Sequence, residues 1–121
     1  MKLKTVQLPS LAAVILAISF AIQISPAEIA PRRIEVVAKR FSFTPAEITL
    51  KKGEPVILVL KSVDVPHGIR FKELGIETKA GKGQTGELAF TPDTAGTFVS
   101  HCSVFCGSGH GTMELTLHVV D

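Results

Sequence analysis

Short segments with the two-residue periodicity of β-strands follow one another from residue 34 to the end of this chain. The segments are 34–38, 41–43, 48–50, 55–61, 69–71, 87–91, 97–102 and 113–120. Turn residues separate many of them, as in Pro92–Gly96. Helical periodicity of useful length is missing from this part of the sequence, so the pattern predicts an all-β, antiparallel sandwich of seven or eight strands.

Alternation within these segments predicts which side chains face the core. The continuous apolar run 55–61 has the length of a buried central strand. In segment 97–102, Cys102 falls on the inner face and His101 on the outer face. One side of the last segment carries four apolar residues, Met113, Leu115, Leu117 and Val119. The stretch 75–86 is rich in Gly and Lys and predicts a loop with a short strand.

A hydrophobic leader precedes the predicted sandwich. Lys2 and Lys4 stand before the apolar stretch 11–24, which has signal-peptide length and is short of the ~20 apolar residues of a membrane-spanning helix. We therefore expect residues 1–27 to be a signal peptide or membrane anchor, 28–33 a linker, and 34–121 the folded domain. Either fate of the leader puts the domain in the periplasm or another extracytoplasmic space, with membrane contact only through an uncleaved N-terminal segment.

The charge balance excludes two classes of partner. The chain has 13 Lys and Arg against 11 Asp and Glu, and the excess lies in Lys2 and Lys4. The predicted domain is therefore neutral, which argues against nucleic-acid binding and against a polybasic membrane surface.

The run from Cys102 to Met113 concentrates soft metal ligands. It contains both cysteines of the chain, one of the four histidines and the only methionine besides the initiator. Sulfur together with imidazole favours copper or zinc over calcium or magnesium. A second histidine, His67 in Asp64-Val65-Pro66-His67, stands at a predicted strand end and could complete the set.

The residues themselves leave four interpretations of this run open. A Cys102–Cys106 disulfide would close a small loop, stabilise the fold weakly and leave His110 and Met113 unexplained. A mononuclear blue-copper site would use His67, Cys106, His110 and Met113 and leave Cys102 idle. Two thiolates could instead bridge a pair of metal ions capped by the two histidines. A Cys2His2 zinc site would have little use for the methionine.

The spacing Cys102-Ser103-x-x-Cys106-Gly107-x-x-His110-x-x-Met113, with Asp64-Val65-x-His67 upstream, resembles the CuA domain of cytochrome c oxidase subunit II. Nitrous oxide reductase carries the same kind of site. The run Phe41–Ile48 and the turn at Gly53 are similar to the opening strands of a cupredoxin. The resemblance covers about residues 34–120 and implies a cupredoxin-like Greek-key β-sandwich.

The resemblance also implies a cofactor and a set of ligands. It implies a binuclear centre of two copper ions, both bridged by Cys102 and Cys106. His67 and Met113 would complete one copper, and His110 with the backbone carbonyl of Val104 would complete the other. Such a centre carries one electron, shared over both metals. The three glycines of the run, Gly107, Gly109 and Gly111, would let the ligand loop fold tightly.

Three departures separate this chain from the common oxidase subunits. Those subunits have a glutamate at the position of Val104, whose carboxylate serves a magnesium site at the contact with subunit I. They also carry Trp and Tyr near the copper, and this chain has neither. They have one or two transmembrane helices, against one short apolar stretch here. The resemblance is therefore strongest to the small ba3-type subunit II or to a free-standing relative.

These observations predict a function and its alternatives. The expected function is one-electron transfer without catalysis of its own. This function includes a role as the electron-entry subunit of a terminal oxidase. Expected partners are a c-type cytochrome or other small redox donor, and a haem–copper oxidase subunit or other redox acceptor. The alternatives are a periplasmic copper-binding or chaperone protein and a mononuclear blue-copper carrier.

Two further residues near the predicted site have open roles in the sequence. Phe105, inside the ligand run, is expected to pack the loop onto the core, with an exposed contact beside the metal as the alternative. Asp64 is expected either to cap a turn or to hydrogen-bond the backbone around His67.

Overall fold

The computed structural model describes residues 1–7, 19–26 and 28–121. Within these ranges the chain forms nine strands and two short 3₁₀ helices. The elements are β1 (Arg32–Lys39), β2 (Ser42–Thr44), β3 (Glu47–Lys51), β4 (Val56–Ser62), β5 (His67–Phe71), η1 (Lys72–Leu74), β6 (Ile76–Ala80), β7 (Thr85–Phe90), β8 (Gly96–His101), η2 (His110–Thr112) and β9 (Glu114–Val120). The fold is therefore all-β, as the sequence predicts.

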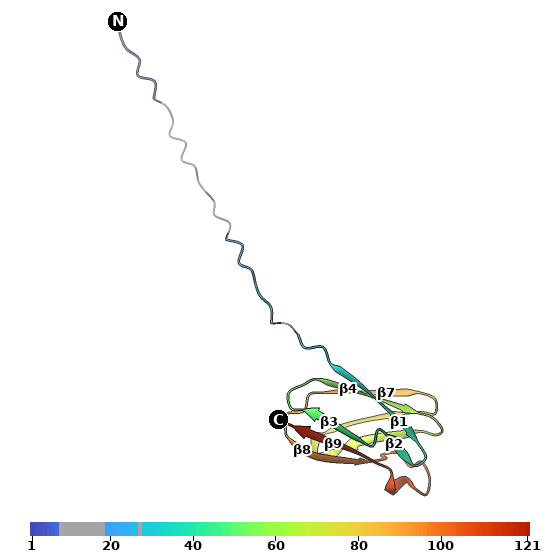
Figure 1. Cartoon of the computed structure of the whole chain (residues 1–121). Coiled ribbons are helices and arrows are strands. Elements are labelled where there is room, and N and C mark those ends of the chain that lie inside the picture. Colours follow the sequence, from blue (N-terminus) through green and yellow to red (C-terminus); the bar gives the residue numbers. More distant parts are fainter. Residues whose placement is uncertain (8–18, 27) are drawn as a thin grey trace.

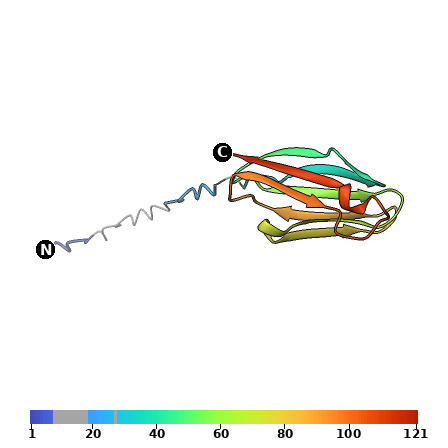
Figure 2. The ribbon, with the colours of Figure 1, turned by 90° about the horizontal axis from the view of Figure 1, so that it is seen from below.

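The strands form two packed layers (Figures 1 and 2). One sheet has the order β2-β1-β4-β7, and a second has the order β3-β9-β8. A third, two-stranded sheet joins β5 and β6. The two-stranded sheet meets the β8 end through a bridge between Ile69 and Cys102.

The expectation of a purely antiparallel sandwich is wrong in two places. Strand β1 runs parallel to β4, and β3 runs parallel to β9. Periodicity reports the spacing of side chains along one strand and carries no information on the direction of its neighbour. The parallel pairs arise because the chain crosses between the layers before it returns to a sheet.

Some strands begin earlier than the sequence predicts, and one expected short strand is confirmed. Strand β1 begins at Arg32, two residues before the first predicted strand at 34. Strand β6 is the short strand expected within the stretch 75–86, and it pairs with β5 over its whole length. Of the five residues of β6, only Ala80 is buried, so this strand carries a weak hydrophobic pattern in the sequence.

The predicted core faces are confirmed. Strand β4 lies between β1 and β7, and its residues Val56, Leu58 and Leu60 are buried. The four apolar residues on one side of the last strand are all buried, at 3% exposure or less. Cys102 is buried while His101 is exposed, as the alternation of segment 97–102 predicts.

The N-terminal segment meets the sandwich at one end, and the run 102–113 lies at the other (Figure 2). Residues 1–7 and 19–26 are exposed and have no regular secondary structure, while residues 8–18 and Ala27 of the predicted leader lie outside the described residues. In the described part of the chain, no helix has the length and apolar character needed to cross a membrane.

Replacing Leu117 by Ala tests the importance of the β9 core face. Leu117 is fully buried on the central strand of its sheet, so Leu117→Ala should lower the free energy of unfolding by about 2–5 kcal/mol. Denaturant unfolding measures this change. Val120→Ala is the matched control, because Val120 is 48% exposed on the same strand, and a loss as large in the control would contradict the assigned faces.

Candidate metal centre

Three strand ends and the connection between β8 and β9 bring the predicted ligands to one end of the sandwich. His67 is the first residue of β5, Cys102 directly follows β8, and Met113 directly precedes β9. Cys106 and His110 lie in the connection between β8 and β9, which is drawn in orange and red in Figure 2. Because the strands are held by their ladders, these residues are positioned by the body of the fold.

Three of the donor atoms lie close together in the interior. One ring nitrogen of His67 and the sulfurs of Cys102 and Cys106 all lie within 4.8 Å of one another. His67 is fully buried, and the two cysteines are 2% and 4% exposed. Both cysteines are free thiols, so the fold presents two sulfurs at this point and no disulfide joins them.

Each sulfur has its own set of neighbours. Cys102 Sγ lies 3.6 Å from His67 Nδ1 and 3.1 Å from the carbonyl oxygen of Val104. Cys106 Sγ lies 3.9 Å from His110 Nδ1 and 3.9 Å from Met113 Sδ. All six residues singled out in the sequence thus join one cluster of contacts.

Asp64 fixes the orientation of the His67 ring. Its Oδ1 lies 2.8 Å from His67 Nε2, so the neutral imidazole donates from Nε2 and turns its Nδ1 lone pair towards Cys102. The backbone N–H of Arg40, which donates to Asp64 Oδ2, is the main reason why the pKa of this carboxyl lies well below its usual range. Burial opposes that shift, and the hydrogen bonds from His67 and Val65 add to it. Asp64 therefore accepts hydrogen bonds from backbone N–H groups beside His67, as the sequence predicts, and its contact with the His67 ring is an additional role that the sequence did not predict.

The ligand run packs against three residues that sequence reasoning missed. A Cβ on Gly68 would stand 2.3 Å from Ser103 Oγ, so only glycine lets the run lie this close to β5. The ring of Phe41 would lie 2.5 Å from a Cβ on Gly109 and 2.9 Å from one on Gly107. The third residue, Arg40, donates from Nε to the carbonyl of Cys106. Gly68 could have been identified from the sequence because it directly follows the candidate ligand His67. Phe41 and Arg40 offered no such signal, because they are distant from the ligand run in sequence.

The expected role of the loop glycines holds for two of the three positions. Gly107 has φ of 135°, a conformation that side chains rarely adopt, and Gly109 faces the Phe41 ring. A Cβ on Gly111 would meet nothing within 4 Å, so its backbone does not require glycine for space.

Phe105 does not pack onto the core. Its side chain is 80% exposed, and its ring lies 5.7 Å from that of His110, measured between centroids. The preferred expectation of a core plug is therefore wrong, and Phe105 is exposed as the alternative requires. The flanking cysteines point inward, which turns the intervening side chain towards solvent.

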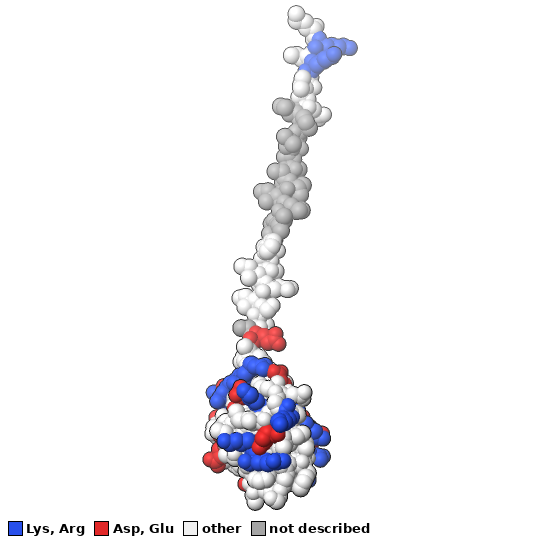
Figure 3. Space-filling view, turned by 90° about the vertical axis from the view of Figure 1, so that its right-hand side faces the viewer, with Lys and Arg blue, Asp and Glu red and all other residues white. Residues whose placement is uncertain are grey.

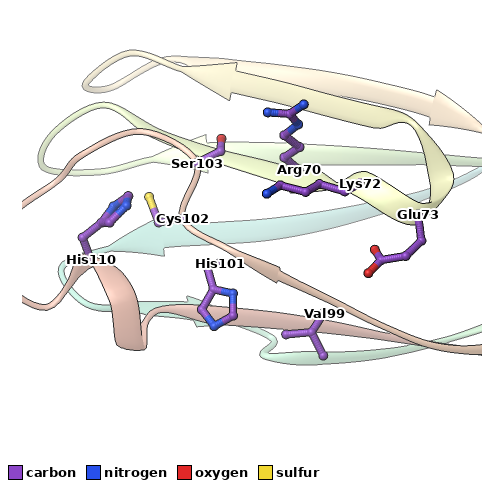
Figure 4. Close-up of a pocket in the computed structure, with 8 residues that line it drawn as sticks. All are labelled: Arg70, Lys72, Glu73, Val99, His101, Cys102, Ser103 and His110. Carbon is purple, nitrogen blue, oxygen red and sulfur yellow. The ribbon is translucent and has the colours of Figure 1, made fainter.

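A cleft opens beside the cluster on the β5 side. Its volume is about 580 Å³, and Cys102, Ser103 and His110 line one end of it. Figure 4 shows Lys72 of η1 extending towards Cys102 and Ser103, Arg70 of β5 pointing away from His101, and His101 on the other side of the opening. His101 is exposed, and its Nε2 lies 3.0 Å from Glu114 Oε1, so it takes no part in the cluster.

The donor set fits a soft metal ion. Burial, the largest cause, and the neighbouring Cys102 together raise the pKa of the Cys106 thiol to about 11. Two adjacent buried thiolates would repel each other without a cation between them. A bound metal supplies that positive charge and deprotonates its coordinating thiols. Two sulfurs, two imidazoles and a thioether are the ligands that select copper or zinc.

The raised pKa of Cys106 predicts the alkaline behaviour of the metal-free protein. An unfolded thiol ionises near pH 9.0, whereas the folded one ionises near 11. Above pH 9 the unfolded state is therefore favoured, and the free energy of unfolding should fall as pH rises from 9 towards 11. Denaturant unfolding over this range measures the fall. Cys106→Ser should show a smaller fall, and equal slopes in both proteins would contradict the assignment.

Comparison with known proteins agrees with the fold. A family model described as a cupredoxin-like domain matches residues 11–113. The periplasmic domain of subunit II of cytochrome oxidase from Bradyrhizobium japonicum superposes with a TM-score of 0.67 at 18% identity, covering 78% of this chain and 88% of that one.

Two further solved structures share the architecture. A chain of a heme-copper terminal oxidase dimer matches with a TM-score of 0.66 at 24% identity, over 80% of this chain and 74% of that one. Auracyanin A, a "blue" copper protein from Chloroflexus aurantiacus, matches with a TM-score of 0.63 at 22% identity, over 75% of this chain and all of that one. Because the family model matches residues 11–113, which are most of the chain, this chain belongs to the cupredoxin-like domain family.

Proposed function

We propose that this protein transfers single electrons through a binuclear CuA copper centre outside the cytoplasmic membrane. The observation that carries the proposal is the convergence of two buried thiols on one buried imidazole, all within 4.8 Å. The ligands would be His67, Cys102, the carbonyl of Val104, Cys106, His110 and Met113. The protein would act as an electron carrier without catalysis of its own.

The number and placement of donors favour two ions over one. Zinc in a structural site takes four ligands, and a blue-copper site takes one cysteine, two histidines and a weak axial ligand. Here Cys102 faces His67 and Val104, while Cys106 faces His110 and Met113. A single blue-copper ion would leave one cysteine unused, and a single Cys2His2 zinc ion would leave the Met113 thioether unused, whereas two bridged ions would use every donor in the cluster.

The protein's contribution is to hold these donors rigidly and keep them from water. Bound copper supplies a site that accepts and releases one electron. Strands β5 and β9 position His67 and Met113, and Asp64 orients the His67 ring. Burial of both cysteines excludes solvent from the sulfurs. Rigid ligands suit electron transfer, because little rearrangement accompanies the change of charge.

The exposed surface of the run from Cys102 to Met113 is the proposed contact for redox partners, with the cleft residues Arg70 and Lys72 on one side of it. The run from Cys102 to Met113 contains no charged residue, and Phe105 projects from it. Figure 3 shows positive and negative side chains intermingled over the presented face, with an uncharged lower end where Figure 1 places this run. A c-type cytochrome or another small redox donor would dock there by apolar contact, and an oxidase subunit or other redox acceptor would receive the electron.

Val104 supports a looser relation to an oxidase than the common subunits have. Its backbone carbonyl can serve as a ligand, but its side chain offers no carboxylate for a magnesium ion at a subunit interface. We therefore favour a ba3-type subunit II or a free-standing carrier, with the N-terminal segment entering the fold at the end opposite the site (Figure 2).

Copper content is the direct test of the proposed centre. Reconstituted protein should hold two copper ions per chain, with an electron paramagnetic resonance spectrum whose hyperfine splitting is shared by two nuclei. Cys102→Ser removes one bridging sulfur and should reduce the content to one ion with splitting from a single nucleus.

The neighbouring substitution His101→Ala provides the control. His101 is exposed and directed away from the cluster, so this variant should keep both ions and the parent spectrum. One copper per chain in fully loaded parent protein would exclude the binuclear centre and favour a blue-copper carrier. Zinc retained in preference to copper under competition would exclude electron transfer altogether.

Replacing Phe105 by Ala tests the proposed docking surface. A central exposed aromatic contributes ~1 kcal/mol or more to a contact, so Phe105→Ala should slow electron exchange with a c-type cytochrome by about fivefold to tenfold. Stopped-flow absorbance measures the second-order rate. The copper spectrum should not change, and Val120→Ala at the other end should react like the parent. An unchanged rate in Phe105→Ala would place docking elsewhere.

A further inference from the structure

Arg40, between β1 and β2, hydrogen-bonds to both halves of the candidate site. Its backbone N–H donates to Asp64 Oδ2 at 2.8 Å, and its side-chain Nε–H donates to the carbonyl of Cys106 at 2.9 Å. Asp64 in turn accepts from His67 Nε2 at 2.8 Å. These hydrogen bonds link His67 to Cys106 through Asp64 and Arg40, and Arg40 lies far from both ligands in sequence.

The Asp64 side of this connection belongs to the body of the fold. The N–H of Val63 donates to the carbonyl of Ala38, so the end of β4 remains attached to the end of β1 beyond the last paired residues. Arg40 follows directly and continues the attachment through the Asp64 carboxylate. The His67 segment is thus tied to the end of β1 by backbone donors that side-chain substitution would leave in place.

The Cys106 side depends on the arginine side chain. Cys106 lies in the middle of the connection between β8 and β9, away from the ladder at either end. The Arg40 side chain and the Phe41 ring lie against the same side of Gly107, where a Cβ would stand 3.7 Å from Arg40 Nε and 2.9 Å from the ring. Because a guanidinium is planar and rigid, it holds the carbonyl in a defined place, which a flexible ammonium would do less well.

We propose that Arg40 is a positioning residue that clamps the Cys106 turn to the Asp64–His67 segment before metal binds. The clamp would keep both sulfurs and the imidazole in binding geometry without help from the metal. The metal-free loop would then open rarely, and bound copper would leave slowly. The expected slow loss of bound copper rests on the proposed function, whereas the clamp in the metal-free protein does not.

Thiol labelling of the metal-free protein tests the clamp without any copper. Cys106 is 4% exposed, so an aromatic disulfide reagent reaches it only when the turn opens. Arg40→Met removes the side-chain hydrogen bond and keeps the backbone donor to Asp64. The loss of one such bond corresponds to an increase in the labelling rate of Cys106 of about threefold to tenfold.

Two control variants separate the clamp from other causes. Arg70→Met removes a positive charge from the cleft beside Cys102 and should label at the parent rate, since the Arg70 side chain pairs with Glu77 on β6 and not with the Cys106 turn. Ile48→Val, in the core, weakens the whole fold by about 0.5–1.5 kcal/mol. An equal increase in either control would overturn the proposal, because charge or global unfolding would then explain the labelling.

Copper loss to a chelator completes the experiment. Loaded Arg40→Met should lose copper faster than the parent by a factor similar to that seen in labelling. If the parent holds two ions and Arg40→Met labels like the parent, the clamp is overturned and the proposed function stands. If labelling changes as expected but the parent never holds two ions, the proposed function fails and the clamp stands.

Discussion

Two buried sulfur atoms pressed against one buried imidazole are the arrangement on which this molecule depends. Burial and mutual proximity disfavour ionisation of the thiols, as the raised pKa of Cys106 reflects. A cation placed between them reverses that preference, because it stabilises the thiolates it coordinates. The same packing that disfavours charge in the metal-free protein therefore makes the cluster a strong site for a soft metal.

Holding such a cluster requires support from outside the ligand run. The strand ladders deliver His67, Cys102 and Met113 to one end of the sandwich, but they do not by themselves orient a ring or a turn. Asp64 orients the imidazole, and Gly68 allows the run to approach β5 closely. Arg40 and Phe41 contact the turn that contains Cys106. The candidate site is thus built from residues spread over most of the domain.

The ligand cluster was predictable from sequence because its chemistry is local and rare. Cysteine, histidine and methionine at short spacing have few structural explanations, and His67 completed the set by residue type. The all-β fold was predictable because alternation marks inner and outer faces. Parallel pairing of β1 with β4 was not predictable, since side-chain period is independent of strand direction. The exposure of Phe105 also depends on how the turn folds over its neighbours.

The sequence alone determined which donor atoms are available, on which strand faces they lie and that the chain forms a β-sandwich. Residue type and period decide these properties, and both can be read along a single chain. Only the tertiary structure decided that Cys102 faces His67, that Cys106 faces Met113, and that Arg40 links the two segments. Most of these contacts join residues far apart in sequence, and the geometry of all of them follows from strand pairing and packing.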